Sequence, residues 1–190
     1  ITKQDPVKLL FPGNWADPTV TRVGDVYYLT SNNDQYVPSV LVFQSTDLRN
    51  WDPISYASPL EGQGPATDIV AFGDRLFIYG GGGMGAWVMY ADPPYMVWSE
   101  RFNIHPVESH PIDAGHIADT NGNLFLYTAQ GKVVKLSQYG LSALSPPEKV
   151  YDAWEIPDYI DIECVCLESP KLFHFNDWYY MVSAAGGTAG

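Results

Sequence analysis

The chain has 190 residues, a formal net charge of −12, and 46% hydrophobic against 17% charged residues. This balance is typical of a folded domain with a sizeable core and excludes a disordered chain. The negative charge argues against nucleic acid and anionic membrane surfaces as partners, since both would repel it. No apolar run approaches the roughly 20 residues that a membrane helix needs. A neutral ligand therefore fits this chain better than a polyanion.

Short strand-like runs recur along the chain, and helical periodicity is nearly absent. Each run follows a Gly-Asp, Asn-Gly or Asn-Asp step, and such steps favour tight hairpin turns. The runs are VYYLTS at 26–31, LFIYGG at 76–81, LFLYTA at 124–129 and YYMVSA at 179–184. The sequence therefore predicts an all-β chain built from antiparallel hairpins.

An acidic residue stands at the start of each of these hairpins. The four acids are Asp17, Asp68, Asp113 and Glu168. They are about 50 residues apart, and a period of this length made of strands and turns is typical of β-propeller blades. A second element, at 42–51 and 88–98, adds a strand, a loop and a closing Trp. We expect Trp51 and Trp98 to pack between blades.

The repeat predicts one β-propeller domain over residues 1–190, with blades that begin near the four acids. The innermost strand of each blade lines the central channel, so the acids are expected around one axial pocket. The fourth repeat contains a single hairpin. We therefore expect a further C-terminal segment or a second chain to complete the ring, because an open ring exposes strand edges.

Several carboxylates in one pocket suit glycoside hydrolysis. That reaction needs a protonated carboxylic acid for the leaving oxygen and an ionised carboxylate to activate water or attack the sugar. A neighbouring negative charge keeps the acid protonated. Acids at strand starts also cap turns, which is the structural alternative for each of them.

Three segments resemble glycoside hydrolase family 43. They are WADPTVTRVGDVYYLTSNN with STDLRNWDPI, IDAGHIADTNGNLFLY, and ESPKLFHFNDWYYMVSAAGGT. The resemblance implies a five-bladed β-propeller, of which the chain covers about blades 1 to 4. It also implies an inverting hydrolase of arabinofuranosides or xylosides, with Asp17 as general base and Glu168 as general acid. Asp113 would tune the ionisation of the acid and orient it.

Four further residues are candidates for contact with the sugar. Trp15 could form an aromatic wall beside Asp17, and Asn33 and His116 could bind hydroxyl groups. Asp68 either contacts substrate or accepts hydrogen bonds inside the channel. Glu163 is the alternative to Glu168 as the general acid.

Two other functions stay open. One is a carbohydrate-binding propeller without catalysis. The other is a retaining hydrolase related to fructan-cleaving propellers, although their NDPNG motif is not matched by ADPTV at 16–20.

We expect the chemistry to require no cofactor, and this chain leaves open whether the central channel holds a structural calcium ion. Cys164 and Cys166 lie two residues apart, and a disulfide between them in a strand would be strained, so free thiols are expected. We expect the protein to be secreted or periplasmic, with the cytoplasm as the alternative.

Overall fold

The computed structural model describes residues 10–13, 15–32, 39–58, 67–81, 85–105, 107 and 113–187. Within these residues the structure is all-β, with fourteen strands and one short 3₁₀ helix. Three antiparallel sheets have four strands each, and a fourth sheet has two. Strands that follow one another in the sequence lie side by side in every sheet, as the hairpin pattern predicts.

We call the sheets blades 1 to 4 in chain order. Blade 1 consists of β1 (Ala16–Val23), β2 (Val26–Asn32), β3 (Ser39–Ser45) and β4 (Asp52–Ser58). Blade 2 consists of β5 (Asp68–Phe72), β6 (Arg75–Gly80), β7 (Trp87–Ala91) and β8 (Phe102–Asn103). Blade 3 consists of β9 (Gly115–Ala118), β10 (Leu124–Thr128), β11 (Lys132–Leu136) and β12 (Glu148–Lys149), with the helix η1 (Ala129–Gly131) between β10 and β11. Blade 4 is the hairpin of β13 (Leu167–Phe175) and β14 (Trp178–Ala185).

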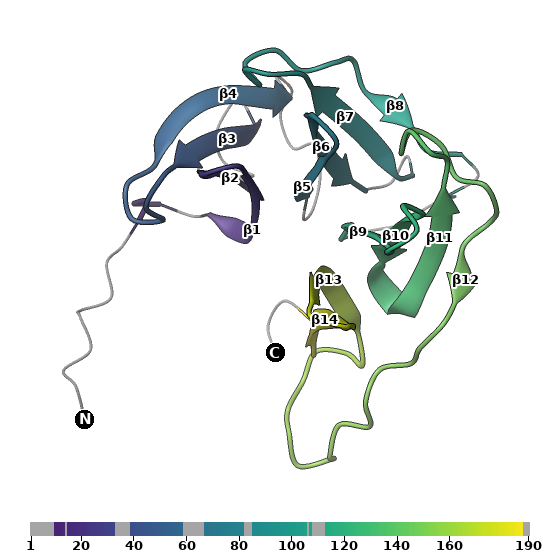
Figure 1. The fold of residues 1–190 in the computed structure, drawn as a ribbon. Coiled ribbons are helices and arrows are strands. Elements are labelled where there is room, and N and C mark those ends of the chain that lie inside the picture. Colours follow the sequence, from purple (N-terminus) through teal and green to yellow (C-terminus); the bar gives the residue numbers. More distant parts are fainter. Residues whose placement is uncertain are drawn as a thin grey trace.

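The blades stand around a common centre, with their first strands innermost (Figure 1). Strand β1 contacts β5, β5 contacts β9, and β9 contacts β13. This arrangement confirms the β-propeller architecture that the repeat predicts. The innermost strands place the starts of all four blades beside one channel.

The core lies between neighbouring blades rather than within any one of them. Successive side chains of a strand point to opposite faces, and β6 shows the consequence. Leu76 and Ile78 join a cluster with blade 1, whereas Phe77 and Tyr79 join a second cluster with blade 3. A strand that is buried on both faces must be apolar at every position, which explains the continuous run LFIY.

Trp98 links blades 1 and 2, as expected from its place in the repeat. Its ring packs against the cluster between these blades, and its Nε1 donates to Ser55 Oγ at 3.1 Å. Ser55 Oγ in turn donates to the carbonyl oxygen of Tyr95 at 3.0 Å. The side chain therefore fixes the position of blade 2 against β4.

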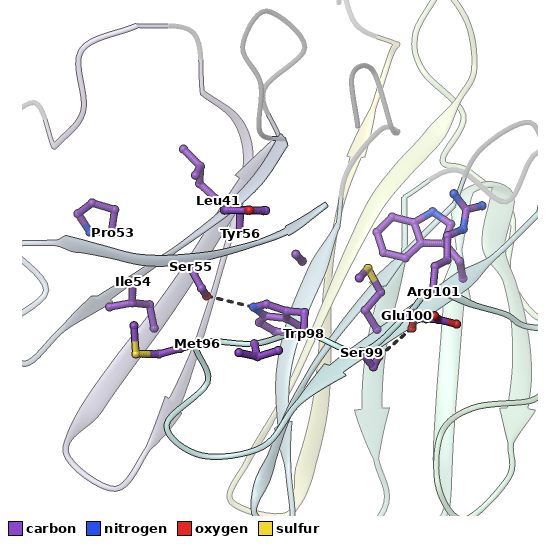
Figure 2. Close-up of a pocket in the computed structure, with 14 residues that line it drawn as sticks. Leu41, Pro53, Ile54, Ser55, Tyr56, Met96, Trp98, Ser99, Glu100 and Arg101 are labelled. Atoms are coloured by element: carbon purple, nitrogen blue, oxygen red, sulfur yellow. Dashed lines mark hydrogen bonds between the residues drawn. The ribbon is translucent and has the colours of Figure 1, made fainter. Parts of the chain in front are cut away.

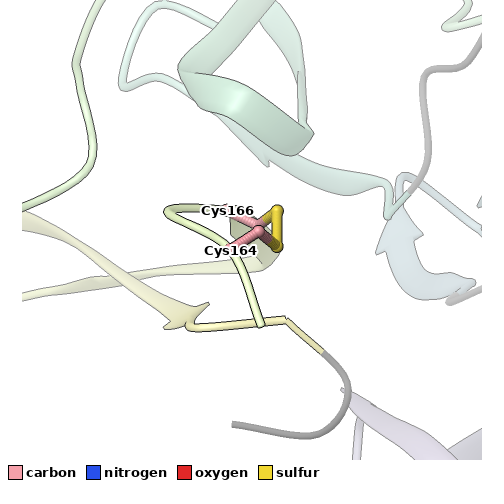
Figure 3. Close-up of a disulfide and its surroundings, with 2 residues drawn as sticks. All are labelled: Cys164 and Cys166. Carbon is pink, nitrogen blue, oxygen red and sulfur yellow. A yellow bond between two sulfur atoms is a disulfide. The ribbon is translucent and has the colours of Figure 1, made fainter. Parts of the chain in front are cut away.

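The expectation of free thiols is wrong. Cys164 and Cys166 form a disulfide, with their Cα atoms 5.2 Å apart (Figure 3). Both residues precede β13 and lie outside any strand, so the strand geometry on which the expectation rested does not apply. The backbone N–H of Gly186 donates to the carbonyl oxygen of Cys166 at 3.2 Å, which continues the hairpin of blade 4 beyond Leu167.

No helix in the ranges given above is long and apolar enough to cross a membrane.

Candidate active site

Blades 1, 3 and 4 begin with the same unusual backbone conformation. Asp17, Asp113 and Ser169 have φ angles of 50°, 65° and 48°. This left-handed region costs a residue other than glycine about 1–2 kcal/mol, and such strain concentrates at functional sites. Ser169 contacts both of the other two residues.

In blades 1 and 4 the strained residue belongs to a β-bulge. Asp17 and Pro18 together face one residue of β2, and Ser169 and Pro170 face one residue of β14. In both blades the facing residue is a serine that donates to the carbonyl oxygen before the bulge. The two bonds run from Ser31 Oγ to Ala16 O at 2.5 Å and from Ser183 Oγ to Glu168 O at 2.6 Å.

This register corrects the equivalence of the four acids. Asp17 and Ser169 occupy equivalent bulge positions, so Glu168 lies one position earlier in its blade than Asp17 does in blade 1. Asp68 instead lies level with Thr19 and Lys171, since Thr19 Oγ1 donates to its Oδ1 at 2.7 Å and Lys171 Nζ is 3.8 Å from the same oxygen. The acids therefore occupy two levels instead of one ring.

Ser169 joins the acids at the upper level. Its backbone N–H donates to Asp113 Oδ2 at 3.1 Å, and its hydroxyl donates to Asp17 Oδ1 at 3.4 Å. Glu168 directly precedes Ser169 in β13. Asp17 and Glu168 are half-buried, whereas Asp113 is only 5% exposed. The structure thus brings the three predicted catalytic carboxylates to one place.

Burial raises the pKa of Asp113 above its ordinary value, and the N–H of Ser169 opposes this effect. The negative charges of Glu168 and Asp17 raise the pKa of Asp113 further, and the Lys171 ammonium lowers it. The pKa of Asp113 thus responds to the charges of both other candidate carboxyl groups. Carboxylates with different surroundings can take different protonation states at one pH, which acid–base catalysis requires.

Asp68 forms the lower level together with a lysine. Its Oδ2 accepts a hydrogen bond of 2.7 Å from the backbone N–H of His116, and Lys171 Nζ lies 3.8 Å from its Oδ1. Burial raises the pKa of Asp68, while Lys171, the His116 N–H and the Thr19 hydroxyl lower it. Of the two roles expected for Asp68, the geometry matches that of an acceptor inside the channel.

A calcium ion does not fit at Asp68. Calcium takes six to eight oxygen ligands, whereas both oxygens of this carboxylate already accept hydrogen bonds and an ammonium group lies beside it. The residues that the structure describes also contain no group of three or more His, Cys, Asp or Glu side chains that could hold a metal.

The predicted sugar-contacting residues are dispersed. The Trp15 ring lies 5.8 Å from those of Phe11 and Phe43, centroid to centroid, in an aromatic group at the start of blade 1. The His116 ring stacks on Tyr79 at 4.9 Å and is buried, so it packs between blades 2 and 3. Asn33 lies outside the described residues.

The sequence interpretation missed Ser169, Lys171 and Thr19. Lys171 carried no readable signal, because simple strand alternation from Glu168 places position 171 on the opposite face. The β-bulge at Ser169 and Pro170 removes that alternation, and Thr19 likewise follows the bulge at Asp17 and Pro18. Only the hydrogen bonds across blades show what these residues do.

A separate groove of about 800 Å³ lies between blades 1 and 2, outside the channel (Figure 2). It is lined mainly by apolar residues of β4 and of the segment after β7, among them Tyr56, Met96 and Trp98. None of the predicted catalytic acids lines it. The groove is therefore distinct from the candidate active site.

Comparison with solved structures shows the same fold at low sequence identity. A GH43_12 protein from a capybara gut metagenome superposes with a TM-score of 0.76 at 22% identity, over 97% of this chain and 40% of its own. The Bacillus licheniformis GH43 protein BlXynB superposes with a TM-score of 0.72 at 21% identity, over 92% of this chain and 37% of its own.

Sequence comparison finds longer relatives. A xylan 1,3-beta-xylosidase from Vibrio sp is 24% identical over 98% of this chain and 38% of its own length. A xylosidase/arabinosidase 43B from Humicola insolens is 24% identical over 94% of this chain and 37% of its own length. The chain thus spans less than two fifths of these relatives. Because the model of glycosyl hydrolases family 43 matches residues 6–190, the chain belongs to that family.

Proposed function

We propose that the protein is a glycoside hydrolase that cleaves arabinofuranosyl or xylosyl linkages in plant-type polysaccharides or oligosaccharides. The observation that carries this proposal is the contact of Ser169 with both Asp17 and Asp113, directly beside Glu168. It brings carboxyl groups from the starts of blades 1 and 3 to the residue that directly follows Glu168 in blade 4. The sugar class is supported by relatives named as xylosidases and arabinosidases.

In the proposed mechanism Asp17 removes a proton from water while Glu168 protonates the leaving oxygen. The water attacks from the opposite face of the sugar, which inverts the anomeric centre. The buried Asp113, held by the Ser169 N–H, tunes and orients the acid. In a sugar complex, inversion requires the carboxyl groups of Asp17 and Glu168 to lie about 6.5–9.5 Å apart, and a separation of about 5 Å would support retention.

The test is hydrolysis of aryl arabinofuranosides and aryl xylosides by the full-length protein. We expect Asp17→Asn and Glu168→Gln each to lower kcat by about 10²–10⁴-fold, because each removes one proton-transfer group. The loss in Glu168→Gln should shrink for an aryl group that leaves easily without a proton. The exposed Asp25 and Glu148 provide matched controls, and Asp25→Asn and Glu148→Gln should retain full activity.

A carbohydrate-binding propeller without catalysis is the second candidate, supported by the same channel. It predicts that the wild-type protein binds arabino- and xylo-oligosaccharides while hydrolysing none of them. That result would refute the enzymatic proposal, as would unchanged kcat in both carboxyl variants.

We also propose that further protein covers blade 4, either from the same chain or from a second one. Seven of the eight residues of β14 are exposed, including Trp178, Tyr180 and Val182. The equivalent strand β2 has Tyr28 and Leu29 buried. An apolar strand with an unpaired edge invites pairing with another strand.

A secreted or periplasmic location is part of the proposal. The disulfide of Cys164 and Cys166 supports it, because disulfides persist in oxidising compartments.

A further inference from the structure

The ammonium group of Lys171 joins three blades near the candidate catalytic acids. Lys171 extends from β13, and its Nζ donates to the carbonyl oxygens of Thr67 and Ala114, both at 3.0 Å. The same atom lies 3.8 Å from Asp68 Oδ1. Thr67 precedes β5 and Ala114 precedes β9, so the contacts reach from blade 4 to blades 2 and 3.

The number of oxygen acceptors around this ammonium group equals the number of its N–H donors. A lysine ammonium has three N–H donors and no acceptor, and here it meets two carbonyl oxygens and one carboxylate. The Lys171 side chain is 27% exposed and that of Asp68 is 7% exposed. A cluster of two carbonyl oxygens and a carboxylate attracts a cation, and the chain supplies that cation from its own side chain.

The same ammonium holds both sides of the contact between Asp113 and Ser169. Ala114 directly follows Asp113, whose positive φ of 65° makes its conformation costly. Lys171 lies two residues after Ser169, which donates its N–H to Asp113 Oδ2. Loss of the ammonium would free the Ala114 carbonyl and leave the strained residue held from one side only.

Close packing at this level leaves little room for an alternative arrangement. A Cβ atom on Gly115 would overlap the carbonyl oxygen of Pro170, the residue just before Lys171. Strands β9 and β13 are therefore in backbone contact beside the ammonium. A side chain that replaces Lys171 must therefore fit between these closely packed strands.

We propose that Lys171 is a positioning residue of the candidate active site, whose ammonium acts as a built-in channel cation and holds Asp113 in place beside Asp17 and Glu168. The effect on turnover rests on the glycosidase function proposed above. The effect on the Asp113 carboxyl does not depend on that function, because it is measured in the protein without substrate.

The test compares Lys171→Met with the double variant Asp68→Asn/Lys171→Met in the full-length protein. Methionine keeps most of the side-chain length but removes the charge and the three donors. The double variant also removes the buried carboxylate, whose positive counterpart the single variant takes away. Lys132→Met, at an exposed position of β11, is the control. The readouts are kcat, KM, Tm and the titration of the Asp113 carboxyl by ¹³C NMR.

We expect Lys171→Met to lower kcat about 10–100-fold, the size of effect that a misplaced catalytic group has, with KM changed less than about twofold. The Asp113 carboxyl should titrate at higher pH, because a positive charge is lost. In the double variant Tm should recover, whereas kcat and the Asp113 titration should stay at the values of the single variant. Lys132→Met should match the wild type in every readout.

The proposal is overturned if Lys171→Met lowers Tm alone, or if the double variant restores Tm and kcat together, since Lys171 would then serve only to neutralise Asp68. If Lys171→Met does not fold, Tm and kcat of the double variant decide the question. A wild-type kcat in the double variant would overturn the proposal, and a lowered kcat would support it. If the wild type hydrolyses no glycoside, the proposed function fails, and the Asp113 titration still tests whether Lys171 positions that carboxyl.

Discussion

The ionisable side chains around the channel differ in what surrounds them. Asp113 meets two other carboxyl groups and the N–H of Ser169. His116, three residues later, points to the other side of β9 and stacks on Tyr79, and its Nε2 has no hydrogen-bond partner among the described residues. The surroundings of Asp113 suit a group that takes part in proton transfer. The surroundings of His116 favour the uncharged imidazole ring.

His116 should make the stability of the protein depend on pH. Burial lowers the pKa of His116 from 6.5 to about 4. Between these values the unfolded chain binds more protons than the folded one, so stability falls as the pH falls from about 6.5 to about 4. The lowered pKa corresponds to a loss of about 3 kcal/mol. We expect His116→Phe to lose less stability than the wild type between pH 7 and pH 4 in urea unfolding.

The control for this prediction is His174→Phe. His174 also stacks on a tyrosine, with its ring 4.5 Å from that of Tyr179, but it is exposed. The comparison separates the loss of a buried imidazole from the loss of one that stacks on a tyrosine at the surface. Equal slopes for His116→Phe and the wild type would show that the His116 ring takes up a proton freely in the folded protein.

At the scale of elements, the site depends on how closely β9 and β13 approach each other. Asp113, two residues before β9, and Ser169, within β13, both have positive φ angles, and the Ser169 N–H donates to Asp113 Oδ2. Gly115 permits this approach because it lacks a side chain where the Pro170 carbonyl lies. The glycine therefore matters for the site as well as for packing.

We expect Gly115→Ala to lower stability by about 1–3 kcal/mol, the usual cost of overpacking, and also to lower kcat, because β9 must move away from β13. Gly122→Ala is the comparison, since its φ is +78° but nothing lies within 4 Å of the added Cβ. That change should cost about 1–2 kcal/mol and leave kcat unaffected. Urea unfolding and hydrolysis assays on both variants measure the difference. A Gly115→Ala enzyme with normal kcat would show that the close contact of Gly115 with Pro170 is not needed for activity.

At the scale of the molecule, blades 1 to 3 and blade 4 differ in their surroundings. The first two interfaces each bury a cluster contributed by both neighbouring blades. The blade 4 hairpin instead exposes Phe173, Phe175, Trp178 and Val182. Large exposed apolar patches mark surfaces that contact other protein.

The exposed hairpin predicts how the isolated segment behaves. Produced alone, residues 1–190 should associate through blade 4, whereas the protein isolated from its source should show additional protein mass in native mass spectrometry. Light scattering after gel filtration measures the first expectation. A monodisperse monomer of 21.1 kDa in both preparations would contradict the proposal that further protein covers this hairpin.

Much of the fold could be predicted from the sequence because its determinants are local. Turn residues and the alternation of side chains set the hairpins, and the repeat of about 50 residues sets the blades. The repeat marks Asp17, Asp68, Asp113 and Glu168, and the resemblance to glycoside hydrolase family 43 selects Asp17, Asp113 and Glu168 among them as catalytic candidates. Their roles as base, tuning group and acid remain predictions.

Contacts between blades could not be predicted, because they join residues far apart in the sequence. The bond from Thr19 to Asp68, for example, joins residues 49 positions apart in the sequence. The disulfide depends on where β13 begins. The sequence by itself determined which residues start the blades, and only the tertiary structure decided that Ser169 and Lys171 connect them, because a hydrogen bond across a channel requires both strands to be docked.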